Sequence, residues 1–210
     1  MFFTLLISIL TPLTNIFTKK VRGLENLPKK GPYIIAVNHV SFADPVFLTV
    51  ALKKKLKGQT KNIYIIAKRK IIWRLFTLRG SEILFNLLIV NPRNKKSVLK
   101  KSEQILKKKN ILVIFFEGTR SWTGRLQKGK TGTARLALKL RLPVIPVGLQ
   151  GTKEFWGRGK IIPRYKKNIL INIGKQISFE DLYHKDVNKK LLDKATERIN
   201  NKVKKLLKQK

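Results

Sequence analysis

Short, continuous runs of apolar residues alternate along the chain with longer stretches in which apolar residues recur at helical spacing. A continuous apolar run of this kind predicts a β-strand that is buried on both faces of a sheet. Six runs have this form: Tyr33–Val37, Ile63–Ala67, Leu87–Val90, Ile111–Phe116, Pro143–Leu149 and Ile169–Ile173.

The segments between and after these runs predict helices at residues 46–56, 95–109, 131–140 and 189–210. Pro45 stands at the start of the first of them, in a helical turn where proline is tolerated. Strands that alternate with helices predict a largely parallel sheet with both faces covered. We therefore expect a single-domain α/β sandwich, in which helices flank a mostly parallel, mixed sheet.

The N-terminus differs from the rest of the chain. Residues 1–17 are apolar and carry no charge, and basic residues follow at once. This run is slightly shorter than the roughly 20 residues that span a bilayer, and Pro12 interrupts it. Three interpretations stay open: a half-inserted anchor, a marginal transmembrane segment, or a core helix. We expect residues 1–20 to form a short membrane-associated helical segment and residues 21–210 to form the domain.

Composition adds a strong charge. Lys and Arg total 47 against 11 Asp and Glu, which gives a formal net charge of +36 over 210 residues. Such an excess indicates an acidic partner: nucleic acid, an anionic bilayer or a phosphorylated small molecule. The apolar N-terminal run favours the bilayer, because basic residues beside such a run suit an anionic cytoplasmic leaflet. We expect the protein at the cytoplasmic face of the cell membrane.

The absence of cysteine excludes disulfides and thiolate chemistry, and two histidines far apart disfavour a zinc site, so we expect no metal. One histidine, His39, follows the first predicted strand, and Asp44 follows it five residues later. A carboxylate at this spacing can orient an imidazole as a general base. Ser41 between them predicts a turn residue that caps the loop or the next helix.

A second candidate loop follows the fourth predicted strand and contains Glu117, Gly118, Thr119 and Arg120. Gly118 permits close approach of the backbone to a ligand, Arg120 offers a planar fork for phosphate oxygens, and Glu117 can orient Arg120 or accept from a hydroxyl. Because loops after parallel strands meet at one edge of a sheet, this loop and His39 can face the same crevice.

These residues together resemble the glycerolipid acyltransferase family, and in particular the 1-acyl-glycerol-3-phosphate (lysophosphatidate) acyltransferases. The resemblance covers about residues 21–177 and rests on four blocks in order: Asn38-His39…Asp44-Pro45, Phe116-Glu117-Gly118-Thr119-Arg120-Ser121, Lys130-Thr131-Gly132 and Pro143-Val144-Ile145-Pro146-Val147. The lead-in from Val21 to Pro28 is also similar.

Two positions depart from the family pattern. Phe116 stands where the family has proline, and the glycine-led strand that ends in arginine is blurred. Arg93 is our choice for the phosphate-binding role of that arginine, with Arg79 second; the alternative is an exposed turn residue.

The resemblance implies transfer of an acyl group from a thioester, carried on coenzyme A or acyl carrier protein, to the sn-2 hydroxyl of lysophosphatidate, giving phosphatidate. His39 and Asp44 would be the catalytic pair. The substrate-binding residues would be Arg93, Glu117, Gly118, Thr119, Arg120 and Lys130. The resemblance implies no cofactor beyond the thioester co-substrate.

Alternative acceptors are glycerol-3-phosphate and another lysophospholipid. A basic nucleic-acid-binding module is the remaining alternative, but it gives no role to His39 and Asp44, so we expect no nucleic-acid partner. His184 predicts a surface residue. Trp73, Trp122 and Trp156 are either core residues or interfacial side chains at headgroup depth.

Overall fold

A seven-stranded sheet forms the centre of the protein in a computed structural model. The structure describes residues 11, 12, 14–56, 62–68, 86–91, 93–160, 162, 164, 165, 168–183 and 186–209. The strands are β1 (Thr18–Arg22), β2 (Tyr33–Val37), β3 (Ile63–Lys68), β4 (Asn86–Val90), β5 (Ile111–Phe115), β6 (Val144–Gln150) and β7 (Ile169–Ile173).

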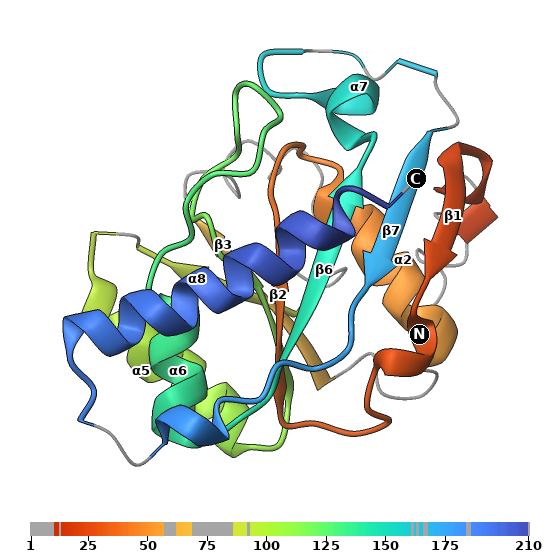
Figure 1. The fold of residues 1–210 in the computed structure, drawn as a ribbon. Helices are drawn as coiled ribbons and strands as arrows, with labels where there is room; N and C mark the ends of the chain where they lie inside the picture. Colours follow the sequence, from red (N-terminus) through yellow and green to blue (C-terminus); the bar gives the residue numbers. More distant parts are fainter. Residues whose placement is uncertain are drawn as a thin grey trace.

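The strand order is β1-β7-β6-β2-β5-β3-β4. Every neighbouring pair is parallel except β6 and β7. The predicted mostly parallel, mixed sheet is therefore confirmed. The carboxyl ends of β2, β3, β4, β5 and β6 lie along one edge, which we call the carboxyl edge, at the top of Figure 1.

Helices cover both faces of this sheet (Figure 1). Strand β2 shows how its sequence serves both: Tyr33, Ile35 and Val37 pack in the core on the side of α2, and Ile34 and Ala36 pack on the side of α6 and α8. All five residues are buried, which explains why the strand is apolar throughout. The helices are α2 (Asp44–Lys55), α5 (Lys95–Lys107), α6 (Gly132–Leu140), α7 (Thr152–Trp156) and α8 (Lys189–Leu206), with 3-10 turns η1 (Leu24–Asn26) and η3 (Glu180–Leu182).

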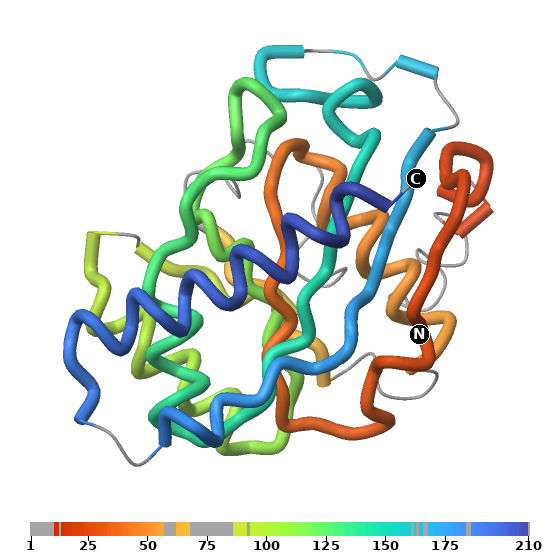
Figure 2. The backbone as a smooth tube through the Cα atoms, viewed as in Figure 1, coloured from red at the N-terminus to blue at the C-terminus, as the bar shows by residue number. Residues whose placement is uncertain are grey.

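Besides the two 3-10 turns, one strand and one helix were not predicted. Strand β1 has the sequence TKKVR, which contains no apolar run, yet it pairs in parallel with β7 at the edge of the sheet. Figure 2 shows this red segment running beside the blue β7. Helix α7 has five residues, too few for a helical period to be visible in the sequence.

The N-terminal segment enters the described structure only in part. Residues 11, 12 and 14–17 are helical, and Phe17 packs its ring on Phe155 and Tyr165, with centroids 4.7 and 5.4 Å away. Searched over the described residues, the helices include none with the length and apolar character that crossing a membrane requires. Residues 1–10 lie outside the described part, and the membrane association of residues 1–20 stays a prediction.

Candidate active site

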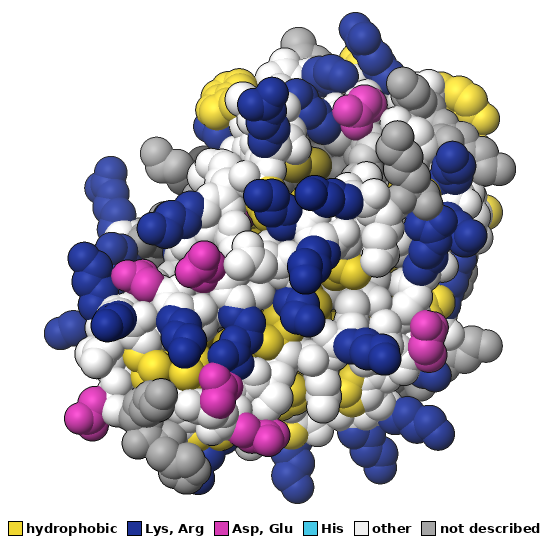
Figure 3. All heavy atoms as spheres, in the orientation of Figure 1, with side chains coloured by type: hydrophobic (Ala, Val, Ile, Leu, Met, Phe, Trp, Pro, Cys, Tyr) yellow, Lys and Arg dark blue, Asp and Glu magenta, His cyan; other side chains and the backbone are white. Residues whose placement is uncertain are grey.

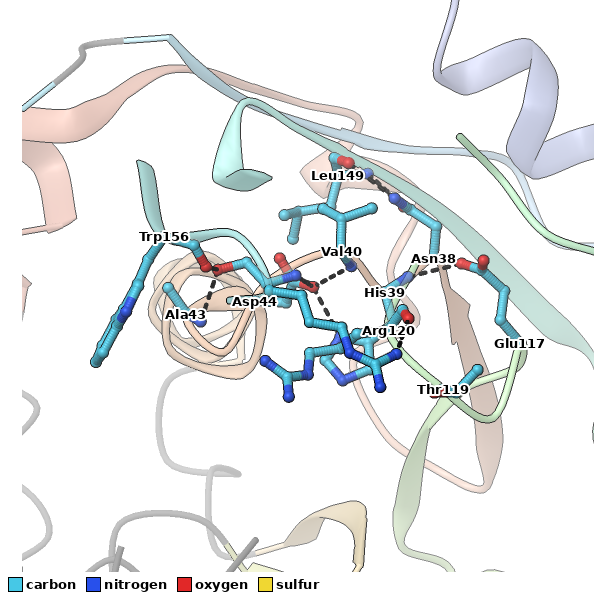
Figure 4. A network of polar contacts seen from close by, with 12 residues as sticks. Asn38, His39, Val40, Ala43, Asp44, Glu117, Thr119, Arg120, Leu149 and Trp156 are labelled. Atoms are coloured by element: carbon cyan, nitrogen blue, oxygen red, sulfur yellow. Dashed lines mark hydrogen bonds and ion pairs between the residues drawn. The ribbon is translucent and has the colours of Figure 1, made fainter. Parts of the chain in front are cut away.

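His39 and Asp44 meet at the carboxyl edge, directly after β2. The Nδ1 atom of His39 lies 2.8 Å from Oδ2 of Asp44, and this oxygen also accepts the backbone N–H groups of Val40 and Ser41 at 2.8 Å each (Figure 4). Asp44 is fully buried and begins helix α2. With Nδ1 held by the carboxylate, Nε2 is the ring nitrogen left to exchange a proton with a substrate.

A second contact fixes the plane of the imidazole. The ring of His39 stacks on Phe115, with centroids 4.0 Å apart and planes inclined by 25°. The side chain of His39 remains 13% exposed, so it is enclosed without being sealed from a ligand. Strand register explains this stack, because Phe115 pairs with Val37, two residues before His39.

Asn38 holds the end of β2 in place. Its side-chain amide donates to the backbone oxygen of Leu149 at 2.9 Å and accepts from the same residue's N–H at 2.8 Å. The amide thus bonds to β6 as a further strand residue would, while the backbone turns away to carry His39 out of the sheet. Asn38 was part of the predicted motif, but this positioning contact was not predicted.

Ser41 is a turn residue, as predicted. Its hydroxyl oxygen accepts the N–H of Ala43, the residue before helix α2, and its proton is donated to the backbone oxygen of Trp156. Ser41 is fully buried. These contacts attach the His39 loop to α7.

Glu117 joins the second loop to the first. One carboxylate oxygen accepts the backbone N–H of His39 at 2.7 Å, and the other accepts the N–H of Gln127 at 2.8 Å. A third contact, from the N–H of Ser121 to the oxygen of His39 at 2.8 Å, adds to this junction. Burial raises the pKa of Glu117, and the two N–H donors oppose that shift. The carboxylate is thus placed to position the backbone of His39, a role that the sequence did not predict.

Arg120 lies against the His39 loop. Its guanidinium carbon stands 3.3 Å from the centroid of the Phe42 ring, a cation–π contact. Phe42 stands between His39 and Asp44 in the sequence, so this contact brings the two candidate loops together at the carboxyl edge. Arg158, two residues after the end of α7, donates to the backbone oxygen of Arg120 at 3.1 Å and so supports this loop.

The remaining predicted residues of the second loop cluster around Gly118. Its φ of +74° lies in the left-handed region, and a Cβ there would come within 2.9 Å of three terminal side-chain atoms of Lys130. The exposed Lys130 thus extends across the loop, and its N–H donates to Phe116 at 2.8 Å. The oxygen of Thr119 accepts the side-chain amide of Gln127 at 3.4 Å.

Arg93 lies farther away. It is exposed in the turn after β4, and β4 is the third strand from β2 in the sheet. At the usual strand spacing this is roughly 14 Å along the carboxyl edge. Its phosphate-binding role stays a prediction. Arg79, Trp73 and His184 lie outside the described residues.

Three residues of the site were not anticipated: Phe42, Phe115 and Arg158. Phe42 lies inside the block at residues 38–45, and Phe115 directly precedes the block at residues 116–121. Their position beside charged motif residues could have predicted aromatic contacts with the site. Arg158 comes from a separate loop, and no sequence motif linked it to the site. Within the described ranges, no group of three or more His, Asp or Glu side chains is arranged to hold a metal ion.

A family model described as Acyltransferase matches residues 19–150. The 1-acyl-sn-glycerol-3-phosphate acyltransferases LPAT1 of Arabidopsis thaliana and BAT2 of Brassica napus, both named chloroplastic, are 35% and 34% identical to 71% of this chain. The chain spans about two fifths of their length, with 39% and 40% covered.

A bacterial relative and a solved structure extend the comparison. The 1-acyl-sn-glycerol-3-phosphate acyltransferase of Borreliella burgdorferi is 29% identical over 73% of this chain and 56% of its own. The crystal structure of the 1-acyl-sn-glycerophosphate acyltransferase PlsC from Thermotoga maritima has the same fold, with a TM-score of 0.64, 20% identity, and coverage of 97% of this chain and 80% of that one. The family match includes both candidate loops, and the chain therefore belongs to the acyltransferase family.

Proposed function

We propose that this protein transfers an acyl group from a thioester to the free hydroxyl of lysophosphatidate, at the cytoplasmic face of a membrane. The observation that carries the proposal is the pairing of His39 with a buried Asp44 beside the guanidinium of Arg120. That combination supplies a general base and a phosphate ligand on two loops that contact each other. The names of the plant and bacterial relatives support lysophosphatidate as acceptor and the sn-2 hydroxyl as the reacting group.

The reaction needs one base that returns its proton. Nε2 of His39 takes the proton of the hydroxyl as its oxygen bonds to the thioester carbonyl carbon. The tetrahedral intermediate then collapses, the carbon–sulfur bond breaks, and the imidazolium gives the proton to the departing sulfur. Asp44 stabilises the imidazolium through Nδ1. General-base catalysis of this kind contributes roughly 10²–10⁴-fold to the rate.

The acceptor phosphate has several candidate partners. Arg120 provides a planar group, packed on Phe42 of the His39 loop, that can bind phosphate in a bidentate way, and Lys130 adds a flexible cation that crosses Gly118. Holding the phosphate would also align the hydroxyl with the base, which reduces the entropic cost of the reaction. In this proposal Glu117 positions His39 by accepting its backbone N–H. Arg93 contacts the acceptor only if the phosphate extends toward β4.

The test uses the full chain with lysophosphatidate and acyl-coenzyme A or acyl carrier protein as donor. We expect His39→Ala to lower kcat by at least about 10²-fold while the protein still unfolds in one cooperative transition, because the base is lost and the fold keeps its core. Arg120→Ala should raise KM for the acceptor more than KM for the donor. Near-normal turnover by His39→Ala would remove the base from the mechanism.

The same assay discriminates the alternative acceptors. Glycerol-3-phosphate and other lysophospholipids are supplied in parallel with each donor, and release of the free thiol is followed. A higher kcat/KM for one of them would reassign the acceptor while leaving the roles of His39 and Asp44 in place.

A further inference from the structure

Several large apolar side chains are exposed in the loops beside α7 and in the segment before β1. Trp122 is 65% exposed, Ile162 74% and Tyr165 75%, and Ile16 beside the start of β1 is 48% exposed. We call these four residues the apolar rim. Folded proteins bury most large apolar side chains, so a group of exposed ones at a single end of the molecule indicates a binding surface.

Side-chain contacts link two of the rim residues, Trp122 and Tyr165, to the region around α7. The guanidinium of Arg158 lies 3.8 Å from the Trp122 ring centroid, and Gly159 also approaches that ring. In helix α7, which directly precedes these residues, Phe155 packs on Phe17. Phe17 in turn contacts Tyr165. Trp122 thus lies beside the second candidate loop, and Tyr165 lies beside the segment before β1, with α7 packed against that segment.

The rim adjoins the site itself. Arg158, which supports Trp122, also donates to the backbone oxygen of Arg120. Ser41 of the His39 loop donates to the oxygen of Trp156 in α7. A partner that covered the rim would thus lie next to the loops that carry His39 and Arg120.

Charge identifies the partner. Arg125, Arg164 and the half-buried Arg158 and Lys160 accompany the rim, against the single exposed acid Glu154 on α7. Figure 3 shows basic side chains at the upper end of the molecule, with hydrophobic ones at its margins, where Figure 1 draws α7 and its loops. Aromatic side chains with nearby arginines suit the headgroup region of an anionic bilayer, where rings insert and guanidinium groups meet lipid phosphates.

We propose that the apolar rim docks this end of the molecule on an anionic lipid bilayer, so that the candidate site opens toward the membrane surface. This deepens the proposed function, on which it rests, by naming the surface through which a lipid acceptor arrives. Trp122, Ile162 and Tyr165 belong to loops of the folded domain and lie outside the predicted N-terminal membrane segment, which contains Ile16.

Flotation with vesicles tests the proposal. The full chain is mixed with vesicles of phosphatidylcholine alone or of phosphatidylcholine with phosphatidylglycerol. We expect Trp122→Ser, and separately Ile162→Ser with Tyr165→Ser, to lower the partition coefficient on the anionic vesicles about tenfold, as loss of inserted apolar area requires. Val187→Ser is the matched control: Val187 is 47% exposed just before α8, at the end away from α7 in Figure 1, and its variant should bind like the parent.

Unchanged binding by both rim variants, with melting temperatures equal to the parent, would overturn the proposal. An equal loss in Val187→Ser would also overturn it, because the effect would then belong to any exposed apolar residue. Turnover of a short-chain, monomeric lysophosphatidate separates this result from the proposed function. Rim variants should keep parental turnover of that soluble acceptor, whereas no turnover by the parent protein would reject the proposed function and leave the flotation result valid.

Discussion

At the scale of single residues, the carboxylate of Asp44 combines two tasks in one oxygen atom. Oδ2 accepts from the imidazole of His39 and from two backbone N–H groups of the loop between them. A fully buried charge requires such compensation, and the N-terminus of α2 adds a favourable dipole. The shape of the loop and the orientation of His39 are therefore not independent, and a change that disturbs one disturbs the other.

Gly118 provides a prediction at this scale. Gly118→Ala places a Cβ at a φ of +74° and against the terminal atoms of Lys130. We expect the free energy of unfolding to fall by about 1–2 kcal/mol from the backbone strain. The flexible Lys130 should move aside, which raises KM for the phosphorylated acceptor. Chemical denaturation and acceptor kinetics measure the two effects.

Gly132→Ala is the matched control for the stability part of this prediction. Gly132 begins helix α6, and a Cβ there would meet nothing within 4 Å. Alanine in a helix is favoured over glycine, so stability should not fall. Equal destabilisation by both substitutions would contradict the argument from φ at Gly118.

At the scale of elements, α8 acts as a brace across the face of the sheet. The side-chain amide of Asn172 in β7 donates to the carbonyl oxygens of Leu206 and Gln209 at the end of the helix. Near the middle of α8, Asn200 accepts the N–H of Gly129, the residue before Lys130. The helix thus fixes the backbone from which a candidate phosphate ligand extends.

A bidentate ion pair ties η3 to α8 and makes stability depend on pH. Arg198 donates to both oxygens of Asp181, at 2.7 and 2.6 Å, and lowers the pKa of Asp181 from 3.8 to about 2. As pH falls, the unfolded chain takes up a proton on Asp181 before the folded protein does. The pair therefore stabilises the fold above pH 3.8, and this contribution is lost as pH falls through about 2.

We expect Asp181→Asn to be less stable than the parent at about pH 5, with the difference shrinking toward about pH 2. Urea unfolding at a series of pH values measures it, and high salt should reduce the effect because the pair is exposed. Asp186→Asn, in the same exposed region before α8, controls for loss of a carboxylate. A difference that grew on acidification would contradict the sign of the shift.

The sequence predicted most elements but few of the contacts between them. All six apolar runs are strands with ends within one residue of prediction, because burial on both faces leaves a clear pattern. Strand β1 and helix α7 carry no such pattern. Motif spacing predicted that His39 and Asp44 belong together. The stack on Phe115 and the contact of Arg120 with Phe42 depend on strand register and loop shape, which spacing does not encode.

Phe116 departs from the family pattern, which has proline at this position, and the structure explains why phenylalanine fits there. The ring at this position is 2% exposed, and a Cβ on Gly129 would come 2.5 Å from one of its carbons. The larger side chain thus fills the space beside Gly129, which lies between the block at residues 116–121 and the block at residues 130–132. Phe116 therefore stabilises this loop by packing, where the family has a proline. The backbone N–H of Lys130 bonds to the oxygen of Phe116, which joins the two ends of the loop.

At the scale of the whole molecule, the formal charge of +36 opposes folding by self-repulsion. We expect the melting temperature to rise as sodium chloride increases from low ionic strength to about 0.15 M, where the Debye length falls to about 8 Å. Differential scanning calorimetry measures this change. Potassium chloride, which screens equally, should give the same curve. A melting temperature that fell with both salts would show that attraction, rather than repulsion, dominates the exposed charges.

Strand β1 begins at Thr18, directly after Phe17 has packed on α7, so no spacer separates the upstream chain from the sheet. Tension or tilt applied to the preceding residues is therefore transmitted to β7 through a hydrogen-bonded ladder. A support that held the upstream chain would set the angle of the entire domain, much as a short rigid stalk sets the angle of the body it carries.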